Sequence, residues 1–323
     1  MSGPITALAG YPLITTDRLT DVRTFYVDEL DFSVVWGVPY FFIKVAVDAD
    51  VPPAFVAWSR IALGAAILLP LAARRGALRG LGDRWRPIAA YAATEIAVPF
   101  TLIAIGEQHV SSSLTAILIS SMPLILALLS LRLAPEERPR GLRLVGLFIG
   151  LGGVVALLGI DVAGTSSELL GAALILVATV GYATAPIIIK RSLADLDPLG
   201  PVAVSLGVSA LVLLPAAIAA PPDAVPSPDA LGSIVALGVI CTAGGLILFF
   251  LLIAEAGPSR ASVVTYFNPL VAVALGLLVL GEHLGAASAV GLALILAGSW
   301  LATGGRPTQL RRGAAVATAS EVR

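Results

Sequence analysis

Ten long apolar stretches follow one another along the chain, separated by short polar breaks. Most approach the roughly 20 residues that an α-helix needs to cross a bilayer. They cover residues 32–47, 54–73, 87–106, 110–132, 143–160, 168–189, 200–220, 230–254, 259–281 and 285–303. The stretches lack the strict alternation of barrel strands and are rich in Leu, Ala and Gly. The sequence therefore predicts an all-α polytopic membrane protein with ten transmembrane helices.

The composition excludes several classes of protein. Hydrophobic residues make up 58% of the chain and charged residues only 13%, whereas a soluble domain carries about a quarter charged residues. The net charge of -1 argues against nucleic acid as a partner. A single cysteine, Cys241, and two histidines leave too few ligands for a structural zinc or a haem. We expect no metal and no cofactor, and the lipid bilayer is the expected surrounding of most of the chain.

Basic residues are distributed on one side of the predicted helices. Most of the 20 Lys and Arg residues fall in the breaks after stretches 2, 4, 6 and 8 and in the C-terminal tail, whereas the other breaks contain none. Short loops rich in Lys and Arg stay in the cytoplasm. We therefore expect a multi-pass protein of the cell (plasma) membrane with both termini in the cytoplasm. Residues 1–31 are predicted to form a polar N-terminal tail and residues 304–323 a cytoplasmic C-terminal tail.

An internal repeat divides the chain into two units of five helices. Pro123 and Glu136 have the same spacing as Pro269 and Glu282, 146 residues further on. The units are residues 32–160 and 168–303. Because five is an odd number, the second unit enters the membrane in the opposite orientation to the first. Inverted-topology repeats are typical of secondary transporters, which bind their solute near the midplane between the halves. The alternative is a duplication retained only as a scaffold.

Several short motifs occur together in this framework, listed here in chain order: Trp36-Gly37 with Lys44, then Arg60, Gly257-Pro258-Ser259-Arg260-Ala261-Ser262, Pro269 and Gly281-Glu282. With the paired five-helix units, they resemble the EamA-type family of the drug/metabolite transporter (DMT) superfamily over residues 32–303. The resemblance implies a ten-helix membrane transporter that often exports amino acids or related metabolites. It also implies a central cavity between the two halves.

The third stretch contains the ionisable residue best placed for transport. Glu95 lies near its middle, with Tyr91 one turn earlier on the same helix face. Ionisable residues within membrane helices usually face a cavity. Glu95 is therefore expected to bind a substrate ammonium group or to take up a proton as the coupling ion. The alternative is a structural ion pair with Arg60 of the second stretch.

Two basic residues give a further hypothesis about the solute. Lys44 lies near the outer end of the first stretch and can extend its ammonium group to the membrane interface. Alternatively, Lys44 and Arg60 bind a substrate carboxylate. Together with Glu95, that arrangement suits a zwitterionic amino acid.

Pro123 and Pro269 are expected to break their helices at matching sites, which frees a backbone carbonyl. Polar neighbours of these prolines are candidate contacts to the solute: Ser120, Ser121, Tyr266 and Asn268. The alternative is a packing kink at which the hydroxyls bond to their own backbone. Trp36, Tyr40 and Tyr182 are expected to line the same space or to serve as interfacial anchors. Glu136 and Glu282 lie at helix junctions, where a role in helix capping or in ordering the loop is expected rather than catalysis.

These observations favour a secondary transporter that exports a small organic solute, a metabolite or a drug, by alternating access. No Gly-Lys-Ser/Thr phosphate loop follows the glycine run at 150–153, so transport is expected to use gradients or passive exchange. Glycines of the fifth and tenth stretches permit close helix contacts, either between the halves or in a homodimer. A polytopic enzyme acting on lipid would show clustered acids or nucleophiles at one membrane face, so we do not expect an enzyme. A non-transporting membrane scaffold is the remaining alternative.

Overall fold

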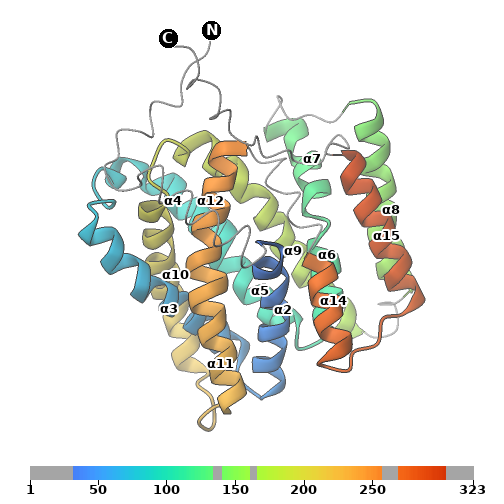
Figure 1. The fold of residues 1–323 in the computed structure, drawn as a ribbon, viewed down its shortest axis with the longest axis horizontal. Helices are drawn as coiled ribbons and strands as arrows, with labels where there is room; N and C mark the ends of the chain where they lie inside the picture. The colour runs from blue at the N-terminus through green and yellow to red at the C-terminus, as the bar shows by residue number, and fades with distance from the viewer. Residues whose placement is uncertain (1–31, 134–139, 161–165, 257–267, 303–323) are drawn as a thin grey trace, which may run out of the picture.

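The computed structural model describes residues 32–133, 140–160, 166–256 and 268–302, and all regular elements among them are helical (Figure 1). Six helical segments are long and apolar enough to cross a membrane: 53–74, 81–106, 112–132, 166–193, 199–219 and 228–253. Apolar helices of 10 to 17 residues occupy 142–157, 268–278 and 286–302. The described residues therefore form an all-helical fold of the membrane type.

The helices of the first half are α2 (Phe32–Asp48), α3 (Pro53–Arg74), η2 (Leu81–Arg84), α4 (Trp85–Tyr91), η3 (Ala92–Ala97), α5 (Val98–Gly106), α6 (Ser112–Ile119), α7 (Met122–Leu133) and α8 (Leu142–Ile160). Those of the second half are α9 (Ser166–Ile188), η5 (Ile189–Leu193), α10 (Leu199–Ala219), α11 (Pro228–Ala236), η6 (Leu237–Gly244), α12 (Gly245–Ala256), α14 (Asn268–Leu278) and α15 (Ala286–Ala302).

Local sequence signals account for several helix starts. The Ser111 hydroxyl oxygen accepts a hydrogen bond from the backbone N–H of Leu114 at 3.1 Å and caps α6. Ser227 caps α11 in the same way through Ala230, at 3.2 Å, and Pro228 follows as the first helical residue. These side chains satisfy backbone donors that have no partner within the first turn.

Equivalent helices of the two halves pack against each other. α3 packs on its equivalent α10, and α8 packs on its equivalent α15. The contact of α2 with α14 has its equivalent in the contact of α9 with α7. In Figure 1, α8 and α15 lie together at one edge of the molecule and α2, α5 and α9 lie near its centre. Pairs of equivalent elements that meet in this way are expected around an approximate two-fold axis. The two units are therefore interlocked rather than placed side by side as separate domains.

The contact between α8 and α15 depends on glycine. A Cβ atom on Gly153 would lie 2.7 Å from Cβ of Leu294, and one on Gly298 would overlap the backbone of Gly150. Gly146 and Gly291 also face the partner helix closely. Small residues let helix backbones approach within a membrane. The glycines of the fifth and tenth stretches thus join the two halves.

The third and eighth stretches share an irregularity. Each contains a π-helical segment, η3 and η6, and residues 92–97 shifted by 146 positions fall within 237–244. A π-turn accommodates an extra residue and commonly occurs at functional sites. Glu95 lies within the first of these segments.

Candidate functional site

A small cavity lies between the two halves. Its lining comes from both units: Trp36, Pro39, Tyr40, Ile43, Arg60, Glu95, Phe100, Ile103, Ile119, Met122, Tyr182, Cys241, Leu246, Phe249 and Asn268. The cavity volume of about 30 Å³ leaves room for about two water molecules. Aliphatic and aromatic groups predominate, and the charged groups are Arg60 and Glu95.

The lining residues follow the internal repeat. Five pairs stand 146 positions apart, namely Trp36 with Tyr182, Glu95 with Cys241, Phe100 with Leu246, Ile103 with Phe249 and Met122 with Asn268. The two units therefore present matching positions to one space. The side chains in each pair differ, so the cavity is symmetric in backbone arrangement and asymmetric in chemistry.

Glu95 is buried, with 1% of its surface exposed, and its Oε2 atom accepts no hydrogen bond. Tyr91 is also fully buried but is not among the cavity-lining residues, and its ring meets that of Phe250 edge-on at 6.2 Å. A buried carboxylate oxygen without a donor is costly and is found where a ligand, a proton or water is bound.

Arg60 does not form an ion pair with Glu95, which was the structural alternative for these two residues. Its Nε donates to the Thr242 hydroxyl of the second half at 3.0 Å, and its guanidinium lies 3.9 Å from the centre of the Phe100 ring. Two ion pairs between described residues are Lys44 with Asp48 and Arg84 with Asp195, and neither involves Arg60 or Glu95. The hydroxyl and the aromatic face hold the guanidinium in place and leave its charge unneutralised.

Asn268 supplies further polar atoms to the cavity. It is the first residue of α14, is 1% exposed, and neither its Nδ2 nor its Oδ1 makes a hydrogen bond. Pro269 follows as the second helical residue, a position where proline costs no backbone hydrogen bond. Pro123 has the same place in α7, directly after the break between α6 and α7.

The two serines at that break do not line the cavity. Ser120 donates its hydroxyl proton to the carbonyl of Ile117 and Ser121 donates to that of Leu118, each at 2.6 Å. The bonds are to their own helix, as in the alternative interpretation of this segment. Tyr266 lies outside the described residues.

The three aromatic candidates all lie at the cavity. Trp36, Tyr40 and Tyr182 are among its lining residues, and the Trp36 ring is 4.8 Å from that of Phe249. These side chains face the space between the halves, so the structure does not place them as interfacial anchors.

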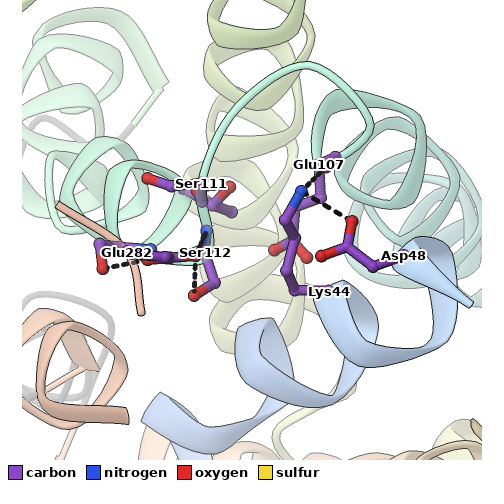
Figure 2. A network of polar contacts seen from close by, with 8 residues as sticks. Lys44, Asp48, Glu107, Ser111, Ser112 and Glu282 are labelled. Carbon is purple, nitrogen blue, oxygen red and sulfur yellow. Dashed lines mark hydrogen bonds and ion pairs between the residues drawn. The ribbon is translucent and has the colours of Figure 1, made fainter. Parts of the chain in front are cut away.

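Lys44 belongs to a separate network near the end of α2 (Figure 2). Its Nζ lies 3.0 Å from Oδ1 of Asp48 and donates to the backbone carbonyl of Glu107 at 3.0 Å. Lys44 does not line the cavity, so the structure does not bring it together with Arg60 at one carboxylate site. The i, i+4 spacing of Lys44 and Asp48 accounts for their pairing.

Glu282 joins the second half to the first in the same region (Figure 2). Its Oε1 accepts from the backbone N–H and the hydroxyl of Ser112 at 2.8 and 2.9 Å, and its Oε2 accepts from those of Ser113 at 3.1 and 2.5 Å. We call this contact the Glu282 clamp. It confirms that Glu282 caps a helix, and the capped helix is α6 of the other half. Glu136 lies outside the described residues.

Glu107 is a buried acid that the sequence analysis missed. It follows the last residue of α5, has 0% of its surface exposed, and neither carboxylate oxygen has a hydrogen-bond partner. Burial raises its pKa well above the ordinary value of 4.5, the nearby Lys44 lowers it in part, and Glu282 raises it further. An acid directly after an apolar stretch reads as a loop residue, and only its contacts identify it as buried.

Comparisons with known proteins agree with this geometry. The EamA-like transporter family model matches residues 32–159 and again residues 169–304. This chain belongs to the EamA-like transporter family. The family resemblance predicted from the motifs is therefore confirmed, and the chain is a multi-pass membrane protein of a transporter family.

Two known proteins are similar to this chain over most of their lengths. The "Uncharacterized transporter YoaV" of Bacillus subtilis (strain 168) is 25% identical over 281 residues, which cover 85% of this chain and 94% of the relative. The "Uncharacterized inner membrane transporter YedA" of Escherichia coli (strain K12) is 27% identical over 280 residues, 84% of this chain and 88% of the relative. A solved structure described as "Crystal structure of protein" has a TM-score of 0.61, with 19% identity, over 83% of this chain and 95% of its own, and shows the same fold.

Proposed function

We propose that this EamA protein is a secondary transporter that exports a small organic metabolite, an amino acid or related solute or a drug, by alternating access. One observation carries the proposal. A carboxylate, Glu95, and a guanidinium, Arg60, line a single cavity between the two repeats without forming an ion pair with each other. Two desolvated charges held apart in this way are costly unless a ligand compensates them.

The proposed topology has ten membrane crossings arranged as two inverted repeats, with both termini in the cytoplasm. The one-sided distribution of basic loops supports this orientation. The five pairs of cavity residues 146 positions apart also support it, because inverted repeats bring equivalent positions to one site near the midplane. With this topology, the Glu282 clamp lies on the outer side.

A zwitterion is the solute class that this cavity favours. Glu95 would accept from an ammonium group, Arg60 would donate to a carboxylate, and the amide of Asn268 offers N–H donors and an acceptor oxygen. The aromatic groups Trp36, Tyr40 and Tyr182 would contact an apolar side chain of the solute. An amino acid or a related metabolite has these groups.

The present cavity is too small for such a solute. A volume of about 30 Å³ holds about two water molecules, and even glycine has five non-hydrogen atoms. We interpret this arrangement as a closed state, from which the proposed transport would require the two repeats to separate on one side at a time. The Glu282 clamp is a contact that must break for opening on its side.

The direct test is solute counterflow in liposomes that contain the purified protein. A panel of amino acids, nucleosides and cationic drugs is assayed with and without a pH gradient. We expect saturable exchange of amino acids or close relatives and no exchange with liposomes that lack protein. Folded protein that exchanges none of these solutes would contradict the proposal and favour an enzyme or a scaffold.

A further inference from the structure

The buried Glu107 lies where the two repeats meet, away from the cavity lining. α2 contributes Lys44 and Asp48 to this region, α6 contributes its N-terminus, and Glu282 enters from the second half (Figure 2). Both oxygens of Glu107 are enclosed and neither accepts a hydrogen bond. The carboxyl group of Glu107 takes no part in the solute binding proposed at Glu95 and Arg60.

Each group that faces Glu107 already has another partner or does not neutralise it. The ammonium group of Lys44 pairs with Asp48 and donates to the backbone carbonyl of Glu107, not to its carboxylate. The Thr115 hydroxyl donates to the carbonyl of Ser111 at 3.0 Å. Arg60 acts on Glu107 only as a more distant charge, and Glu282, held by Ser112 and Ser113, repels it.

The neighbouring α9 brings Tyr182 and α2 brings Tyr40, and both phenols interact electrostatically with Glu107 but carry no charge in their ordinary neutral form. α9 packs against α5 through Gly171 and Ile175, which face Gly106. An ionised Glu107 would therefore be a buried charge whose oxygens lack hydrogen-bond partners in this arrangement, which is strongly unfavourable. The neutral acid avoids most of this cost. A metal ion is a poor alternative because the described residues contain no group of three His, Cys, Asp or Glu side chains that could hold one.

We propose that Glu107 is a proton-binding site whose occupation keeps the adjacent face of the transporter closed. The proton comes from water on that side and binds one carboxylate oxygen of Glu107 in the closed state. When the Glu282 clamp opens, water reaches Glu107, and the proton returns to water. This inference rests on the proposed alternating-access function. It assigns proton coupling to a residue outside the solute cavity, whereas Glu95 binds the solute.

The labelling rate of Cys241 can report whether the outer face is open. Cys241 lines the cavity and is the single cysteine of the sequence. Its labelling by a membrane-impermeant maleimide, added outside to reconstituted protein, measures access from the outer face. Labelling rates are compared between the wild type and Glu107→Gln at each pH, because the ratio cancels the ionisation of the thiol itself.

We expect the ratio of wild-type to Glu107→Gln labelling to rise with pH. One linked proton limits the rise to about tenfold per pH unit. Glu107→Asp should keep the pH dependence, and Asp223→Asn, at an exposed acid between α10 and α11, should match the wild type. A ratio that stays flat between about pH 5 and pH 9 would overturn the proposal.

A second variant covers the case in which Glu107→Gln does not fold. Lys44 favours the ionised form of Glu107, so Lys44→Met should shift the midpoint of the labelling profile to higher pH. A midpoint equal to that of the wild type would overturn the proposal.

Counterflow separates this inference from the proposed function. Wild-type exchange with a pH dependence that Glu107→Gln retains would overturn the inference alone. Absence of any exchange by the wild type would overturn the proposed function, whereas the Cys241 profile would still test Glu107.

Discussion

At the scale of single residues, the two buried acids of the first half lie in different surroundings. Glu95 faces a cavity with Arg60, Asn268 and aromatic groups, so a solute can compensate its charge. Glu107 is enclosed at the contact between the repeats and lacks such a space. We therefore assign solute binding to the first and proton binding to the second.

Removing the charge of Glu95 should weaken binding of solutes that carry an ammonium group. A hydrogen bond to a charged group is worth about 1.5–3 kcal/mol, so Glu95→Gln should raise the half-saturation concentration about 10- to 150-fold in counterflow. The same solute without its amino group is the matched control and should lose far less affinity. An equal loss for both solutes would show that Glu95 does not bind the ammonium group.

Glu107 should make the stability of the closed protein depend on pH. Because burial raises its pKa in the folded state, the folded protein binds this proton more tightly than the unfolded chain. Its contribution is fully present below the ordinary pKa of 4.5 and is lost as the pH rises through the folded-state value. Thermal unfolding in detergent over a pH series should show this decline for the wild type and a flatter profile for Glu107→Gln. Parallel profiles would contradict the assignment.

At the scale of helices, two contacts between the halves have different physical origins. The Glu282 clamp is polar and depends on the approach of α14 to α6. A Cβ atom on Gly276 would overlap the Glu282 carboxylate and lie 2.5 Å from the Ser113 hydroxyl oxygen, so only glycine leaves room there. The contact of α8 with α15 is apolar and close-packed. The hydrogen bonds of the Glu282 clamp can be replaced by hydrogen bonds to water when that face opens. The close packing of α8 on α15 has no such replacement, so it favours keeping the two helices together.

Breaking the clamp should destabilise the protein and open its outer side. Glu282→Ala leaves the backbone N–H groups of Ser112 and Ser113 without an acceptor, at a cost of about 1–3 kcal/mol. The melting temperature in detergent should fall, and labelling of Cys241 from outside should rise several-fold. Asp223→Asn serves as the control for loss of an exposed acid. Unchanged labelling of Glu282→Ala would mean that the clamp does not limit access.

Two neighbouring glycines of α8 give a matched test of the apolar contact. A Cβ atom on Gly153 would lie 2.7 Å from Leu294 Cβ, whereas one on Gly152 meets nothing within 4 Å. Gly153→Ala should therefore destabilise the protein by about 1–3 kcal/mol through overpacking. Gly152→Ala should be neutral or slightly stabilising, because alanine favours helix. Equal melting temperatures for the two variants would contradict the close packing of α8 on α15.

At the scale of the whole molecule, family membership and the pairing of equivalent helices give the two-repeat architecture, and the charge pattern supports the proposed orientation. The proposed topology places the loop between α10 and α11 outside the cell and the loop after α3 inside. The two loops occupy equivalent places in the two units, so their opposite location is the specific consequence of inversion.

Cysteine labelling of whole cells should detect this orientation. In a Cys241→Ala background, Val225→Cys, 88% exposed, should react with a membrane-impermeant maleimide on intact cells. Arg79→Cys, also exposed, should react only after permeabilisation. Reaction of both positions on intact cells would exclude the inverted arrangement.

The sequence by itself determined the features that depend on local composition and on the repeat. Apolar runs of membrane length predict helices, because an unpaired backbone in lipid is too costly, and the 146-residue spacing predicts two similar units. The same reasoning directed attention to Glu95 and Arg60, because charges within apolar runs are rare.

The tertiary structure alone decided which residues meet. Glu282 and Ser112 are 170 positions apart, and Arg60 and Thr242 are 182 apart. No local pattern specifies such contacts, since they depend on how the helices of the two halves pack. For the same reason the sequence left open whether Arg60 pairs with Glu95, an alternative that the structure does not show, and it could not place Lys44 outside the cavity. Glu107 was missed because its burial comes from elements distant in sequence, which enclose the carboxyl only after the chain has folded.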